Sequence, residues 1–167
     1  MRIKFLRGMF AIVTFACSLP SLCYAQDITI STMDGKSGKP LEHIAVTLSI
    51  SDQQLQRVHG GFPSTVVGQK ETLADGTARF SLPPDVPKML IVHLSWGSRK
   101  MVGCETQGTD RFFDTEVVLK TGIIFNNSGC DPNGKLTAKF TATPGKIILF
   151  ARNATFWEKL EGFLVGP

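Results

Sequence analysis

The stretch LADGTARF places a carboxylate, Asp75, between two segments whose residues are typical of β-strands. A loop carboxylate can act as a general acid or base, but it needs a partner group within hydrogen-bond reach. No histidine or second carboxylate stands at a telling spacing from Asp75. Asp-Gly between strand-like segments is instead a strong hairpin signal, because glycine accepts the positive φ of the turn. We therefore predict that Asp75 forms a corner of a sheet and bonds its own backbone.

The histidines are the other candidates for catalysis or metal binding: His43, His59 and His93. Their spacing matches no zinc motif. His93 alternates with the apolar residues of its segment, so we expect it on a strand surface. An enzyme with a site around His43 or His93 stays open as an alternative. It requires two histidines, or a histidine and a carboxylate, to converge in a pocket.

Other motifs predict no chemistry. The stretch CDPNG (130–134) is similar to part of a calcium loop, but it lacks the further oxygen ligands and the final glutamate. The chain contains no glycine-rich phosphate loop and no G-x-S-x-G nucleophile motif. We expect no catalytic residue, no metal site and no cofactor.

Residues 1–25 have the build of a secretory signal peptide. Arg2, Lys4 and Arg7 precede an apolar stretch, and the segment ends in the small residue Ala25. We predict cleavage after Ala25 and a secreted or periplasmic protein, with an uncleaved N-terminal anchor as the alternative. No later stretch is apolar enough over a sufficient length to cross a membrane, so we expect no transmembrane segment after cleavage.

The charge of the remaining chain excludes two classes of partner. Three of the 18 basic residues and none of the 14 acidic residues belong to 1–25, so 26–167 carries a net charge of only about +1. A nucleic-acid-binding protein would show a clustered basic footprint, and a protein held electrostatically at a membrane would need one too. We expect neither. By its length, 26–167 is a single domain.

Two cysteines remain after cleavage, Cys104 and Cys130. An even pair in an oxidising compartment predicts a disulfide. The two do not form the C-x-x-C arrangement of redox-active sites.

Alternation of apolar and polar residues predicts about eight or nine short strands separated by turns, which is typical of an antiparallel β-sandwich. The predicted strands are 27–32, 43–50, 65–73, 78–82, 88–96, 101–107, 112–123, 136–143 and 144–153. The period changes in the C-terminal tail, where Thr155 and Glu158 form a capping box. We predict a short amphipathic helix at about 156–164 that covers an open end of the sandwich, with a docking role for a partner as the alternative.

Three stretches resemble prealbumin-like sandwich modules, in particular the carboxypeptidase-regulatory-like and Cna-B-type repeats. They are the turn Ser37-Gly38-Lys39-Pro40-Leu41, the strand Val46-Thr47-Leu48 and the hairpin from Thr72 to Phe80. The resemblance covers about 28–96. It implies a Greek-key sandwich and a non-catalytic, extracytoplasmic spacer or binding domain. A transthyretin-like hydrolase of the same superfamily ends in Tyr-Arg-Gly-Ser, whereas this chain ends in FLVGP, so we do not expect that activity.

Trp96 and Trp157 are the candidate ring platforms for stacking a sugar. For Trp96 the competing interpretation is a place in the core. The polar connection 51–64 is long enough to carry specificity, and Asn126 and Asn153 start glycosylation sequons. The sequence thus predicts an exported, non-enzymatic module with a protein-binding or structural role at the cell envelope or outside the cell. A carbohydrate-binding module is the alternative, with a glycan as partner.

Overall fold

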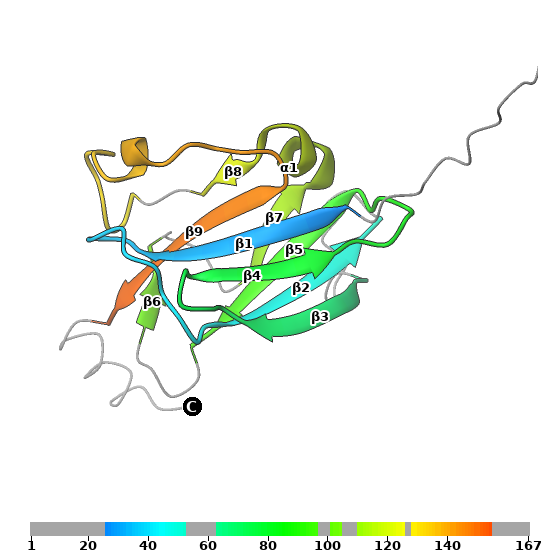
Figure 1. Cartoon of the computed structure of the whole chain (residues 1–167), viewed down its shortest axis with the longest axis horizontal. Helices are drawn as coiled ribbons and strands as arrows, with labels where there is room; N and C mark the ends of the chain where they lie inside the picture. The colour runs from blue at the N-terminus through cyan, green and yellow to red at the C-terminus, as the bar shows by residue number, and fades with distance from the viewer. Residues whose placement is uncertain (1–25, 53–62, 97–100, 105–109, 126–127, 155–167) are drawn as a thin grey trace, which may run out of the picture.

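A computed structural model of the chain describes residues 26–52, 63–96, 101–104, 110–125 and 128–154. Two β-sheets pack face to face, with one short helix at one end (Figure 1). The elements in chain order are β1 (Asp27–Asp34), β2 (Ala45–Ser51), β3 (Thr65–Glu71), β4 (Thr77–Ser81), β5 (Met89–Ser95), β6 (Met101–Gly103), β7 (Asp110–Asp114), α1 (Thr115–Thr121), β8 (Ile123–Ile124), η1 (Thr137–Lys139) and β9 (Lys146–Asn153). No helix in these described ranges could cross a membrane by length and apolar character.

The two sheets confirm the all-β sandwich. One sheet has the order β4-β1-β9-β6, with β8 beside β9, and the other has the order β3-β2-β5-β7. Most neighbours are antiparallel, as predicted. The exceptions are β1 with β9 and β8 with β9, which are parallel. A parallel neighbour requires a crossover connection, and the chain supplies one when it passes over the outside of the first sheet before β9.

The main core lies between the sheets and follows the predicted alternation. Its fully buried side chains come from both sheets: Ile28, Ile30, Val46, Leu48, Leu90, Val92, Ile147 and Leu149. Each of these strands therefore turns one apolar face inward, because successive side chains of a strand point to opposite faces.

A second, smaller core covers the outer face of the first sheet. Ile148 and Phe150 of β9 point away from the main core, yet both are buried. Residues 128–145, which we call the roof, lie above them in Figure 1. Phe140 of the roof meets Phe150 edge to face, with ring centroids 5.4 Å apart. This cover explains why the β9 sequence is apolar on both faces.

The predicted disulfide between Cys104 and Cys130 is present. Cys104 directly follows β6 and is buried in the second core, and Cys130 belongs to the roof. The bond therefore ties the roof to the sheet that it covers.

The predicted strand at 136–143 is wrong. Its start is the short helix η1, and the rest has no strand partner among the described residues. The carboxylate of Asp131 accepts hydrogen bonds from the backbone N–H groups of Leu136 and Thr137, at 2.7 and 2.9 Å. Those bonds occupy donors that a strand would need for its ladder. Phe140 still faces inward, but toward the second core.

The predicted strand at 112–123 is also wrong over most of its length. After β7 the chain forms α1, and only Ile123–Ile124 returns to a strand. Asp114 caps the helix by accepting the N–H of Val117 at 3.1 Å. Glu116 and Lys120 pair one turn apart on its surface. The predicted helix at 156–164 lies outside the described residues.

Removal of the disulfide should free the roof. Because its two ends are separated by 26 positions in the sequence, the crosslink should stabilise the fold by about 3–4 kcal/mol in the chain-entropy model. We expect a Cys104→Ala/Cys130→Ala variant to lose this amount in urea unfolding. Reduction of the wild-type protein should lower its stability similarly, whereas the variant should not respond to the reductant. An unchanged unfolding midpoint after reduction would contradict this role.

The turn at Gly76 offers a test of backbone packing with a matched control. Gly76 and Gly134 both have positive φ, 73° and 66°. A Cβ at Gly76 would lie 2.6 Å from the carbonyl oxygen of Thr32, whereas one at Gly134 would meet nothing within 4 Å. Gly134→Ala should cost about 1 kcal/mol for the backbone conformation. Gly76→Ala should cost clearly more in the same thermal unfolding assay. Equal costs would show that the approach to Thr32 relaxes freely.

Candidate functional sites

Asp75 lies in the turn between β3 and β4. Its carboxylate accepts hydrogen bonds from the hydroxyl and the backbone N–H of Thr77, at 2.7 and 2.9 Å. These bonds hold the pKa of Asp75 below its usual value. The side chain therefore builds the corner, as its sequence context predicts.

The two histidines that the structure describes, His43 and His93, each lie beside one carboxylate on the protein surface. Nδ1 of His93 is 2.8 Å from Asp110, across the β5–β7 pair, and Nδ1 of His43 is 3.4 Å from Glu71. His59 lies outside the described residues. One hollow lies beside α1 and another at the beginning of β3, and neither is lined by a histidine. Neither of these two hollows therefore brings His43 or His93 together with a second group, as the enzyme alternative requires.

Asp131, the first oxygen donor of the calcium-like stretch, organises the roof. Besides the N–H groups of Leu136 and Thr137 it accepts the Thr137 hydroxyl at 3.2 Å. Its pKa is lowered, first by the backbone hydrogen bond from Thr137 and then by the others. In the described part of the chain, no three histidine, cysteine or carboxylate side chains gather as they would around a metal ion.

Trp96 follows β5 and packs, half-buried, against the main core. Trp96 therefore contacts the core, as expected from the interpretation that competes with sugar stacking. Trp157 lies outside the described residues, as do Asn126 and most of the connection 51–64; Asn153 is the exposed last residue of β9.

The described ends of the 51–64 connection line a hollow of about 360 Å³. Its lining residues are Ile50, Ser51, Asp52, Pro63, Ser64 and Thr65. It opens at the beginning of β3, which is an edge strand of its sheet. The hollow and the open edge therefore lie side by side.

A larger hollow of about 630 Å³ lies beside α1. The connection 86–89 forms one wall, the helix with its capping residue Asp114 forms the other, and Gln26 completes the lining. The predicted strand at 112–123 gave no indication of this site, because the hollow depends on the helix α1. The i, i+4 spacing of Glu116 and Lys120, placed just after Asp114, was the signal for a helix that could have revealed it.

One buried charge belongs to β7. The side chain of Arg111 faces inward beside Val92, and burial lowers the pKa of its guanidinium to about 10. The guanidinium remains charged at neutral pH. Phe113, two residues further along β7, also faces the core, because alternate residues of a strand point to the same side.

Comparisons with known proteins assign no family. No protein-family model matches the chain, and no curated protein matches it. Among solved structures, a 9R-lipoxygenase from Cyanothece PCC8801 aligns with a TM-score of 0.31 and 17% identity. The alignment covers 52% of this chain and 12% of the lipoxygenase chain. A likeness at this level carries no argument about fold or activity, and the resemblance to prealbumin-like modules stays a prediction.

The roof should respond to acid through Asp131. Its pKa is lower in the folded protein than the ordinary value of 3.8, so the unfolded chain binds more protons in acid. The free energy of unfolding that this difference contributes is present above pH 3.8 and is lost as the pH falls through the pKa of Asp131 in the folded protein. We expect Asp131→Asn to flatten the loss of unfolding free energy below about pH 4. The control Asp85→Asn alters an exposed carboxylate and should leave the acid profile as in the wild type. An unaltered slope in Asp131→Asn would show that the roof is not tied to this charge.

Proposed function

We propose that the protein is an exported, non-enzymatic β-sandwich module that binds a protein partner at the cell envelope or outside the cell. The observation that carries the proposal is the open edge of β3. Export is supported by the signal-like residues 1–25 and is compatible with the disulfide between Cys104 and Cys130. A non-enzymatic role is supported by Asp75 and Asp131, whose carboxylates both serve their own turns.

β3 is the most accessible edge of the described sheets. It runs for seven residues, and five of them are exposed. Its backbone pairs with β2 on one side only. Val66 presents an apolar side chain that is 61% exposed. An edge of this kind is a template for pairing with an extended segment of another chain.

The other described edges are shorter or more strongly protected. β6 has three residues and ends at the disulfide. β7 begins and ends with exposed aspartates. β4 is adjoined by Lys70, whose ammonium donates to the carbonyl of Arg79 at 2.6 Å and lies 5.4 Å from the ring centroid of Phe80. Charges and short length are the common protections of sheet edges.

The first half of β3 carries no charged side chain. Lys70 occupies the second half, and the register with β2 shifts at Leu48 and Ser49, opposite the strand's first half. Such irregularities strengthen the local twist. A partner segment would therefore pair along 65–68 and could place one side chain in the adjoining hollow of 360 Å³. In this mode, backbone hydrogen bonds give affinity and the hollow gives specificity.

The test is capture of a saturable protein partner from envelope and culture-supernatant extracts by the oxidised protein. We expect Val66→Lys to abolish capture, because it places a charge on the pairing edge. Leu73→Lys is the matched control. Leu73 is 65% exposed and lies just beyond the strand, so this variant should capture the partner as the wild type does.

Three outcomes would contradict the proposal. One is the absence of any saturable protein partner, with retention on a polysaccharide column instead. Another is undiminished capture by Val66→Lys. The third is equal loss in Val66→Lys and Leu73→Lys, with both variants folded by circular dichroism, since that would locate recognition away from the edge.

A further inference from the structure

The hollow beside α1 has the size and composition of a ligand site. Its volume of about 630 Å³ lies inside the range of about 300–1,000 Å³ that is typical of small-ligand pockets. Its apolar lining consists of Val86, Pro87, Met89 and Leu119. Val86 is 45% exposed, so an apolar group placed there would remove hydrophobic surface from water.

The charged side chains of the lining are Lys88, Asp114, Glu116 and Lys120, and most of them already have partners. Asp114 caps α1 through the N–H of Val117. Glu116 and Lys120 form an ion pair, and that pairing raises the pKa of Lys120. Within the described residues, Lys88 is the lining charge that has no hydrogen-bond or ion-pair partner for its side chain. Its backbone carbonyl is fixed, because it accepts the N–H of Thr115 at 3.0 Å.

We propose that this hollow binds the C-terminus of a peptide that ends in an apolar residue. The terminal carboxylate pairs with the ammonium of Lys88, and the last side chain lies against Val86 and Leu119. Peptide termini combine a charge, polar backbone groups and a short apolar group. This combination suits a lining that mixes polar and apolar residues better than a wholly apolar tail would. The site shares no residue with the β3 edge, so it goes beyond the proposed function.

The charges of the hollow predict opposite effects for two neighbouring substitutions. Lys88→Gln removes the cation that would hold the carboxylate, so it should weaken binding. Glu116→Gln releases Lys120 from its ion pair and removes a negative charge from the wall. It should therefore strengthen binding of an anion. A site that recognised an amine instead would respond with both signs reversed.

The experiment is an NMR titration of the oxidised full-length protein with acetyl-Gly-Gly-Val-Leu that carries a free C-terminal carboxylate. The matched ligand is the same peptide with a C-terminal amide. We expect saturable shifts at 86–89 and 114–120 with the carboxylate form. We expect affinity for the amide to be about 3–5-fold weaker, as befits an ion pair at a partly exposed site.

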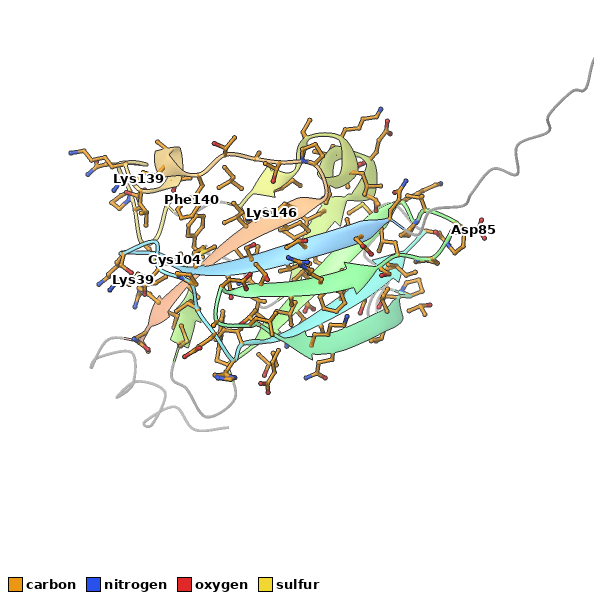
Figure 2. The ribbon with its side chains drawn as sticks, in the orientation of Figure 1. Lys39, Asp85, Cys104, Lys139, Phe140 and Lys146 are labelled. Atoms are coloured by element: carbon orange, nitrogen blue, oxygen red, sulfur yellow. A yellow bond between two sulfur atoms is a disulfide. The ribbon has the colours of Figure 1, made fainter. Side chains whose placement is uncertain are left out.

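The variants sharpen the result. Lys88→Gln should lower affinity for the carboxylate peptide to the level of the amide, and Glu116→Gln should raise it. Lys39→Gln is the control, because Lys39 is an exposed lysine at the far end of the molecule from Asp85, which immediately precedes the hollow wall (Figure 2). It should not change affinity.

Equal affinity for the carboxylate and the amide would overturn the proposal. So would equal effects of Lys88→Gln and Lys39→Gln, or the lack of saturable shifts around the hollow. Each of these outcomes is independent of the capture assay at β3, because the two tests alter different residues and monitor different surfaces.

Discussion

The burial of β9 on both faces is the constraint on which the rest of the structure depends. Ile147 and Leu149 fill the main core, while Ile148 and Phe150 point to the opposite face. A strand with two apolar faces requires cover on both sides. The chain meets this requirement by folding 128–145 over the outside of the first sheet, so the protein has a third layer above the two sheets of the sandwich.

The roof is built with few apolar residues, so it depends on other bonds. Phe140 provides the main aromatic contact, and the disulfide and the carboxylate of Asp131 hold the segment in shape. Asp34 has a similar role in the turn after β1, which touches the roof at Leu136. Burial alone would raise the pKa of Asp34, but hydrogen bonds from Ser37 and Lys36 outweigh it and lower the pKa. Carboxylates that organise turns thus replace part of the missing hydrophobic burial.

The same arrangement decides which surfaces stay accessible. The roof covers the outer face of the first sheet at β9 and at Met33 of β1, and the disulfide adjoins the edge at β6. Exposed apolar side chains are found elsewhere, at Val66 in the first half of β3 and at Val86 in the hollow beside α1. Both lie near connections rather than at strand centres, as is usual for binding residues on a rigid scaffold.

The sequence by itself determined the all-β class, the corner at Asp75 and the pairing of Cys104 with Cys130. Strand alternation and turn chemistry are local, and the predicted removal of 1–25 would leave one pair of cysteines and hence one pairing. Only the tertiary structure decided the place of 136–143 in the roof and the parallel pairing of β1 with β9. The apolar residues of 112–123 and 136–143 are as compatible with a strand as with the helix and the roof that the structure shows. For 136–143 the choice depends on which face of β9 needs to be buried, and that involves residues distant in the chain. The helix after Asp114 instead begins at a local capping bond, since Val117 is only three residues away.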